Sequence, residues 1–504
     1  MIYYCYIKTP KEVAALQKIQ TSGLRFLDEQ GRTRIFNGMN IDDKLVDCTA
    51  FRYPLDEAFF KKYKANGFDL IRLAVTWQNL EPKPEQYNES YLQSLDDIFS
   101  LAEKYGVYIL LDMHQDLYSQ NDGKCVGDGA PAWAAVTDGA KPRMPLFVWA
   151  DGYFLGRWVR REFDNFWNNT PVLGRGLQDR YCDLWQMLAR RYGDSPALFG
   201  YDLMNEPFPG SCSNRMFARL VTGVAKTVAF NKKVPRGKLF KAALKKDTRT
   251  MLDCIGGDVI RDAVRKIDPL EAKFDLEKYA PFLNKTAAAI RDVTDNGIVM
   301  MEQSYICNTG IKQSAPPITV NGVREKNQCF GPHAYDFSVD TPLYQFANAS
   351  RVKAFFGEMR RTQLRLNAPV VVGEWGGCSD NTDTSWFPHA FELLDFFDEM
   401  QWGQLYWDYH GDDMDAPLMT MLSRTHPVAV AGEIIRYGYN RETGVFQLSF
   451  HASEAGESLI YVHKPFVLPD ETDYRIIEQY ENGASLIGVK TAAGKHNITI
   501  QLTK

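Results

Sequence analysis

The sequence lacks several features that would assign it to a particular class of protein. None of its apolar runs approaches 18 residues, so it predicts no membrane-spanning helix. Its nine cysteines form no Cys-x-x-Cys pair and no Cys/His cluster with zinc-ligand spacing, which favours buried thiols in a reducing compartment over a metal site. The formal net charge of −5 gives no general attraction to nucleic acid, so we expect no nucleic-acid partner.

The first residues also lack the basic segment and the apolar segment that together make a secretion signal. As given, the chain would be cytoplasmic, or it would be secreted with its signal already removed. We expect it to be a monomer. A basic stretch, Lys232–Lys246, is typical of a solvated helix face, and the alternative is a peripheral contact with a membrane surface.

The length and composition are those of a large globular protein. Single cores rarely grow beyond about 250–300 residues, so 504 residues fit one large domain and a smaller one. Hydrophobic residues make up 45% of the sequence, which is enough to form a sizeable core. The aromatic fraction is high at 13%, and it indicates either a large core or a groove lined by rings, which suits sugars and apolar ligands.

Eight short apolar runs, separated by amphipathic helical stretches, dominate the first 410 residues. Such runs are typical of parallel strands that are buried on both faces. Two of the helical stretches end at a glycine that can cap them, Gly67 and Gly106. Strands alternating with helices predict an α/β fold, a (β/α)₈ TIM barrel. The predicted strands are Ile35–Ile41, Leu70–Val75, Tyr108–Met113, Leu198–Met204, Ile298–Gln303, Gln328–His333, Val370–Trp375 and Gln404–Tyr409.

Two connections of this barrel are long, and the pattern changes after it. Insertions at 116–170 and 208–296 should emerge at the carboxyl ends of the strands, where barrel enzymes place their active sites. Beyond residue 426 only short strands and turns occur, which predicts a β-sandwich. We therefore expect a catalytic barrel over 1–426 and a sandwich domain over 427–504. The strands expected in it are Val445–Phe450, Ser458–His463, Tyr474–Tyr480 and His496–Leu502.

Two glutamates stand at the carboxyl ends of predicted strands. Glu206 lies in the segment Asp202–Pro207 after the fourth strand, and Glu374 lies in Gly373–Gly376 at the end of the seventh. Glycoside hydrolysis with retention needs two carboxyl groups about 5–5.5 Å apart. Because these strands lie across the barrel mouth from each other, the two glutamates can meet. No metal or organic cofactor is needed for this chemistry, and none is expected.

Other polar and aromatic side chains stand at the same edge of the barrel. Asn205 can hydrogen-bond a sugar hydroxyl beside the reacting carbon, Tyr335 can hydrogen-bond Glu374, and Trp407 offers a platform for a sugar ring. Each motif alone is weak, but their joint occurrence in this strand order favours a glycosidase. We expect the pKa of Glu206 to be raised, helped by the charge of Glu374, which should stay ionised.

The ordered set resembles clan A glycoside hydrolases, and within that clan glycoside hydrolase family five. Several segments are similar to its endoglycoceramidase subgroup, namely Asp112–Ser119, Gly129–Trp133, Phe163–Asn168, Tyr201–Phe208 and Pro427–Gly432. The resemblance implies a retaining β-glycosidase that cleaves the bond between sugar headgroup and ceramide in glycosphingolipids. It implies Glu206 as acid/base and Glu374 as nucleophile.

The resemblance also implies a set of residues that bind the substrate. His114, Asp116 and Gln303 would bind the first sugar, and Lys44 would be a further sugar contact. Arg72 would buttress the nucleophile, and His333 belongs to the same set. The tryptophan-rich loop Trp133–Trp167 would supply an apolar groove for the lipid.

Two alternatives remain open at the level of sequence. The first is an exo-acting β-glucosidase or β-galactosidase on a single sugar linked to an apolar aglycone, such as a galactosylceramide, a sterol or a plant glycoside. In that case the insertion 208–296 would block the sugar side beyond one ring. The second is a barrel that binds carbohydrate or lipid without catalysis, which the loss of either glutamate would favour.

Overall fold

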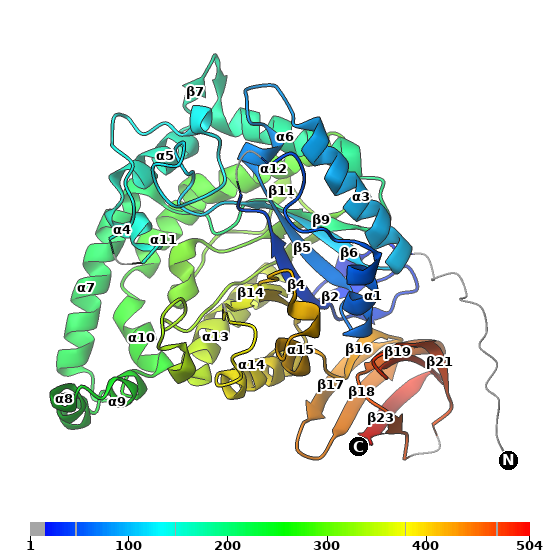
Figure 1. The fold of residues 1–504 in the computed structure, drawn as a ribbon. Coiled ribbons are helices and arrows are strands. Elements are labelled where there is room, and N and C mark those ends of the chain that lie inside the picture. Colours follow the sequence, from blue (N-terminus) through cyan, green and yellow to red (C-terminus); the bar gives the residue numbers. More distant parts are fainter. Residues whose placement is uncertain (1–15, 46–47, 147, 379, 470–471, 504) are drawn as a thin grey trace.

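The computed structural model describes residues 16–45, 48–146, 148–378, 380–469 and 472–503. Eight parallel strands form one sheet, in the order β13, β10, β9, β6, β5, β4, β15, β14 (Figure 1). Bridges between Phe330 and Val370 and between His333 and Glu374 join β13 to β14 and close the barrel. The strands are β4 (Asn37–Asp42), β5 (Leu70–Thr76), β6 (Tyr108–His114), β9 (Leu198–Asp202), β10 (Ile298–Met301), β13 (Gln328–Phe330), β14 (Val371–Gly376) and β15 (Gly403–Trp407).

The predicted (β/α)₈ barrel is confirmed, and all eight strands lie where the apolar runs stand. Helices cover the outside of the barrel, and local capping fixes their ends. The side chain of Asp56 accepts a hydrogen bond from the backbone N–H of Phe59 at the start of α1, and Gly106 ends α3 with a φ of 68°. The covering helices include α1 (Glu57–Ala65), α3 (Glu89–Tyr105), α6 (Leu177–Tyr192), α12 (Ala280–Arg291), α13 (Ala349–Leu366) and α14 (Phe387–Met400).

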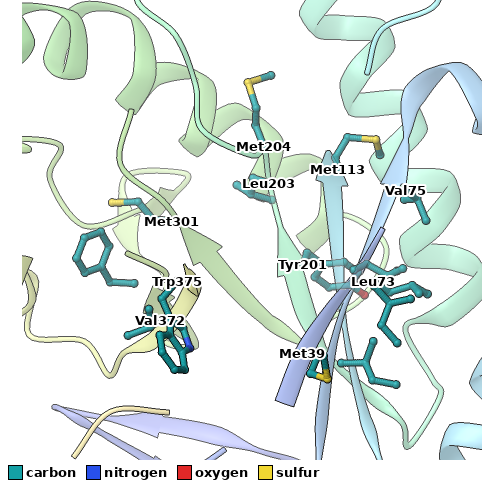
Figure 2. Close-up of a cluster of buried hydrophobic side chains, with 14 of the residues drawn as sticks. Met39, Leu73, Val75, Met113, Tyr201, Leu203, Met204, Met301, Val372 and Trp375 are labelled. Carbon is teal, nitrogen blue, oxygen red and sulfur yellow. The ribbon is translucent and has the colours of Figure 1, made fainter. Parts of the chain in front are cut away.

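Alternation along each strand divides the core into two layers. In β5, Leu70 belongs to the cluster inside the barrel, whereas Leu73 and Val75 belong to the layer between the strands and the helices. Figure 2 shows part of the second layer, where Met113 and Trp375 lie with neighbours from other strands. Because Arg72 is two residues after Leu70, the same alternation directs its charged side chain into the barrel.

The two insertions are largely helical and lie on the side of the barrel where the strands end. The first contains α4 (Asp151–Leu155) and α5 (Arg157–Trp167). Figure 1 shows α7 along one edge of the molecule, with α8 and α9 at its far tip. The second insertion consists of α7 (Ser213–Phe230), α8 (Arg236–Lys245), α9 (Thr248–Asp253), α10 (Gly257–Val264), α11 (Asp268–Phe274) and the π-helical turn η3 (Asp275–Tyr279).

The C-terminal region forms two antiparallel sheets that share one core. The four-stranded sheet has the order β17, β18, β23, β20, and the seven-stranded sheet has the order β1, β2, β3, β16, β19, β22, β21. The predicted sandwich is confirmed, and Phe446 from one sheet and Ile460 from the other are fully buried in its core. The strands are β16 (His426–Val430), β17 (Glu433–Asn440), β18 (Val445–Ala452), β19 (Gly456–Val462), β20 (Phe466–Val467), β21 (Tyr474–Gln479), β22 (Ser485–Thr491) and β23 (Gly494–Leu502).

The start of the chain contributes to this second region. The strands β1 (Gln20–Ser22), β2 (Arg25–Leu27) and β3 (Thr33–Arg34) extend the seven-stranded sheet, and β3 pairs with β16. The division of the chain at residue 427 stays a prediction, and this pairing shows that sheet membership does not follow it strictly.

The described part of the chain contains no helix long and apolar enough to cross a bilayer. Seven of the described cysteines are free thiols, namely Cys125, Cys182, Cys212, Cys254, Cys307, Cys329 and Cys378.

Candidate active site

Glu206 and Glu374 face each other at the mouth of the barrel. Glu374 lies within β14, and Glu206 follows β9 by four residues. A carboxylate oxygen of each and a ring nitrogen of His333 lie within 4.8 Å of one another. Inverting glycosidases separate their carboxyl groups by about 6.5–9.5 Å to admit a water, whereas retaining enzymes keep them about 5–5.5 Å apart. The separation is therefore that of a retaining enzyme.

Two donors hold the carboxylate of Glu374. The guanidinium of Arg72 donates to one oxygen at 2.9 Å, and the hydroxyl of Tyr335 donates to the other at 2.7 Å. Arg72 is completely buried, which would lower its pKa, but the carboxylates around it raise that pKa well above its usual value, so Arg72 stays charged. These contacts fix the orientation of the Glu374 carboxylate.

Glu206 is held in a different way. Its side chain accepts hydrogen bonds from the amide of Asn308 at 2.5 Å and from the ring of His333 at 3.0 Å. Its backbone N–H donates to Glu302 at 2.7 Å, and its φ of 40° lies in the left-handed region that a glutamate rarely adopts. Burial, together with the charge of Glu374, raises the pKa of Glu206 to about 7 despite the contact with His333. At neutral pH a large fraction of the protein molecules therefore carries a proton on this carboxyl group, as a general acid requires.

Below the pair lies a closed network of buried charges. Arg72 contacts Asp112 at 3.1 Å, Asp202 at 2.8 Å and Glu302 at 2.7 Å. Burial would lower the pKa of His333, but neighbouring carboxylates, Glu302 first, raise it well above the ordinary value. Burial raises the pKa of Asp202 well above the ordinary value, and the charge of Glu302 adds to this. The network therefore balances its cations against its carboxylates by keeping some of the carboxyl groups protonated.

One end of the cavity is polar. Lys44 contacts Asp116 at 2.6 Å, and its ammonium lies over the ring of Trp407, 4.4 Å from the ring centre. The ring of His114 stacks on the ring of Trp407, with 5.3 Å between the ring centres. Asn205 and these four residues all line the cavity. The sequence-predicted sugar contacts Lys44, His114, Asp116, Asn205 and Trp407 are thus brought together beside the two glutamates, and their roles stay predictions.

Gln303 is placed differently from these residues. It is buried outside the lining of the cavity, where its amide donates to the side chain of Asn308 at 2.9 Å and to the backbone carbonyl of His333 at 2.7 Å. A direct contact of Gln303 with sugar stays a prediction, and its observed contacts position the two partners of Glu206. Asn308 itself was missed from the sequence, because it lies in the turn η4 (Tyr305–Thr309) beyond β10 and belongs to no motif.

The cavity has a volume of about 730 Å³, and the rest of its lining is largely apolar. We call this part the apolar end. The tryptophan-rich loop was expected to supply this wall, but of its four tryptophans Trp149 alone lines the cavity. Trp158 and Trp167 are buried in the main hydrophobic core. The wall comes largely from both insertions and from the turn η4, with Val126, Val148, Phe154, Met216, Phe217, Leu220, Ile260, Ile267, Ile306 and Ile311.

Among the described residues, three buried groups have donor atoms close enough to bind a metal ion: His114–Asp116–Asp128, Glu206–His333–Glu374 and Asp112–Asp202–Glu302. Each already contains or contacts a cation of the protein. Lys44 lies 2.6 Å from Asp116, His333 lies 3.0 Å from Glu206, and Arg72 binds the third group. The charge balance of these groups therefore requires no metal.

The comparison with known families matches this geometry. The family described as Cellulase (glycosyl hydrolase family 5) matches residues 27–233 and 271–413, and the glycoside hydrolase family 5 C-terminal domain matches residues 424–500. The matched family therefore covers both the barrel that carries the paired carboxylates and the C-terminal domain. The chain belongs to glycosyl hydrolase family 5, and it is a glycoside hydrolase with the carboxylate spacing of a retaining enzyme.

Particular relatives cover nearly the whole chain. The endoglycoceramidase of Hydra vulgaris is 25% identical over 89% of this chain and 81% of its own length. That of Cyanea nozakii is 26% identical over 90% of this chain and 85% of its own. Among solved structures, endo-glycoceramidase II from Rhodococcus sp., as its lactosyl-enzyme intermediate, superposes with a TM-score of 0.71 at 23% identity, covering 96% of this chain and 100% of that one. The last comparison shows that the two proteins share a fold.

Proposed function

We propose that this protein hydrolyses the β-glycosidic bond between the sugar headgroup and the ceramide of glycosphingolipids, with retention of configuration. The observation that carries the proposal is the cavity lining, which combines polar side chains beside the carboxylate pair with a large apolar wall. The polar end suits a glycan and the apolar end suits a lipid. The names of the relatives from Hydra vulgaris and Cyanea nozakii support the same substrate class.

In the first step, Glu374 attacks the anomeric carbon of the sugar next to ceramide. Glu206 gives its proton to the departing oxygen, so ceramide leaves with a hydroxyl group and the glycan becomes an ester of Glu374. In the second step, Glu206 takes a proton from a water molecule, and that water attacks the anomeric carbon. Glu374 leaves as a carboxylate, Glu206 is protonated again, and the free glycan is released.

The electrostatics of the pair drive this exchange of roles. The charge of Glu374 contributes to the raised pKa of Glu206, which therefore starts as an acid. When Glu374 becomes an ester, its charge disappears and the pKa of Glu206 falls. Glu206 is then a base when the water must be activated. Arg72 and Tyr335 would stabilise Glu374 whenever it is charged, at the beginning and the end of the cycle.

The polar end would bind the first sugar. Asn205 can donate to the hydroxyl beside the anomeric carbon, a contact that strengthens in the transition state. Trp407 would stack on the apolar face of the ring, while Lys44 and Asp116 would bind its outer hydroxyls.

The exo-acting alternative predicted that the insertion 208–296 blocks the sugar end. Met216, Phe217 and Leu220 of α7 and Ile260 of α10 instead line the apolar end. This placement favours the endo-acting reading, because the insertion extends the lipid side and leaves the glycan side to the barrel strands.

Product analysis tests the proposal. The purified protein is incubated with lactosylceramide or with glucosylceramide in mild detergent, beside the variant Glu374→Gln. We expect intact lactose and ceramide from lactosylceramide, and no release by the variant. Cleavage of glucosylceramide alone would support the exo-acting alternative, and no release from either lipid would contradict the glycosphingolipid substrate.

A further inference from the structure

The segment 213–246, here called the basic arm, comprises α7, α8 and the turn between them. It contains ten lysines and arginines and no aspartate or glutamate. Since the whole chain carries −5, the rest of it carries −15. Within the described residues, Lys233 is the one cation of the ten that forms an ion pair with a carboxylate, at 2.9 Å from Asp258. The arm is therefore a concentrated, largely uncompensated positive charge on an acidic protein.

The basic arm also exposes large apolar side chains. Phe217, Val221, Val224 and Val228 follow one another at intervals of four, three and four residues, so they form one stripe along α7. On α8, Phe240 is 65% exposed and Leu244 is 71% exposed, one turn apart and flanked by lysines. Single exposed apolar residues are normal on a protein surface, whereas a contiguous stripe marks an interaction site.

This stripe is continuous with the apolar end of the cavity. Phe217 begins the stripe and also lines the cavity, where its ring packs against that of Phe154 with 5.4 Å between the centres. Val148, which also lines the cavity, is partly exposed at 45%. Phe217 therefore connects the cavity wall that would hold a lipid chain to the apolar stripe on the surface of α7.

We propose that the basic arm docks on the surface of an anionic lipid bilayer. The proposal rests on the lipid substrate of the proposed function. The stripe of α7 and the pair on α8 would lie among the acyl chains and headgroups, and the lysines of α8 would lie against the lipid phosphates and carboxylates. A lipid could then pass from the bilayer into the apolar end of the cavity along a continuous apolar surface.

The C-terminal domain offers a rival surface. Tyr474, Ile476 and Ile477 of β21 are exposed on the edge strand of the seven-stranded sheet. The neighbouring cation Arg475 is already paired with Glu457 at 2.6 Å, so its charge is compensated, unlike most of the cations of the basic arm. Figure 1 shows β21 and α8 on opposite sides of the molecule, so the two surfaces can be altered independently.

Vesicle binding and vesicle cleavage together test the proposal. The test variants are Lys238→Gln/Lys241→Gln/Lys245→Gln/Lys246→Gln and Phe240→Ser/Leu244→Ser, all at exposed positions away from the cavity lining. The matched controls are Lys61→Gln/Lys83→Gln/Lys490→Gln/Lys495→Gln, with the same change in charge on other faces, and Ile476→Ser/Ile477→Ser. Each protein is sedimented with phosphatidylcholine vesicles with or without phosphatidylserine, at low and high salt.

We expect wild type to bind the vesicles that contain phosphatidylserine, and to bind them less at high salt. Each lysine near an anionic surface contributes to binding, so the test variants should lose at least about tenfold in affinity while the controls keep it. Cleavage of lactosylceramide embedded in the vesicles should fall in parallel. Cleavage of the same lipid in detergent should not change, because the cavity is intact.

Three outcomes would overturn the docking surface. If wild type does not bind anionic vesicles, the basic arm does not dock on a bilayer, and an acidic protein becomes its expected partner. If the test variants bind like wild type, the basic arm is not part of the membrane contact. Loss of binding in Ile476→Ser/Ile477→Ser alone would transfer docking to the C-terminal domain. Failure of wild type to cleave lactosylceramide in detergent would instead contradict the proposed function, and the sedimentation would still decide the docking.

Discussion

The two ends of the cavity are built in different ways. The polar end consists of side chains at the carboxyl ends of barrel strands, and hydrogen bonds on both sides fix each strand in its register. The apolar end consists mostly of side chains from helices and loops of the two insertions, which no sheet constrains. The difference separates two tasks. Chemistry needs atoms held in fixed positions, whereas selection of a lipid needs only apolar area of sufficient size.

The largest expected effect lies where the two ends meet. Glu374→Gln keeps the hydrogen bonds with Arg72 and Tyr335 possible but removes the nucleophile, so turnover of every β-glycoside should be abolished. Product release from lactosylceramide and from an aryl lactoside, followed over hours, measures this. If the variant cleaves either substrate at the wild-type rate, Glu374 is not the nucleophile.

A second effect depends on the leaving group. Glu206→Gln removes the proton donor, and general acid catalysis contributes about 10²–10⁴-fold, so kcat/KM for lactosylceramide should fall by that factor. An aryl lactoside with an acidic phenol needs little protonation, and its first step should be nearly unaffected. Equal losses for both substrates in rapid-mixing kinetics would contradict the role of Glu206 as acid.

The same residue determines the alkaline side of the pH profile. In the free enzyme Glu206 must carry its proton, and its pKa is raised to about 7. As the pH rises through about 7 this proton is lost, so kcat/KM for lactosylceramide should fall above that pH and be retained below it. A profile that stays flat from about pH 5 to pH 9 would show that no group with this pKa acts as the acid.

A third effect sharpens the contrast between the ends. Leu220 and Ile260 line only the apolar end, and burying a large aliphatic side chain contributes about 1.5–3 kcal/mol. Leu220→Ser/Ile260→Ser should therefore lower kcat/KM for lactosylceramide by about tenfold or more and leave an aryl lactoside unchanged. Asp116→Asn, at the polar end, should lower kcat/KM for both substrates by the same factor. Equal responses of both variants would mean that the two ends do not divide the substrate as proposed.

The smallest effect concerns Asn308. Its amide donates to the carboxylate of Glu206, which stabilises the anion. Asn308→Ala should raise the pKa of Glu206, so the alkaline limb of the profile should move to higher pH while kcat at the optimum stays within about tenfold of wild type. A limb that moves to lower pH would show that Asn308 stabilises the protonated form. Asn308→Asp is no control here, since it would add a charge, whereas Asn308→Gln keeps the donor.

The predictable parts of this protein are those that a repeating pattern encodes. All eight barrel strands follow from apolar runs, and the positions of Glu206 and Glu374 follow from the rule that a parallel barrel gathers its strand ends at one mouth. Trp158 and Trp167 were assigned to a groove because they are large rings near the site, but such rings are equally suited to a core, and burial decides between the two only in three dimensions.

The unpredicted parts depend on contacts between distant segments. Asn308 contacts Glu206 across 102 residues of sequence, from a turn with no motif. The apolar end arises because α7 and α10 pack beside the strand ends, which no periodicity within either helix reveals. The strands β1 to β3 have two or three residues each, too short for any alternation to be read.

Those short strands impose an order on the making of the protein. Arg34 donates to the backbone of Val428 across 394 residues, and β3 pairs with β16, so the outer edge of the short sheet β1–β2–β3 has no partner until β16 has been synthesised. Until then an unpaired strand edge stays exposed, which is the condition under which chains aggregate. The strand β16, which follows the barrel, therefore holds in place strands that precede the barrel, and a chain that stops before residue 426 would keep the edge of β3 unpaired.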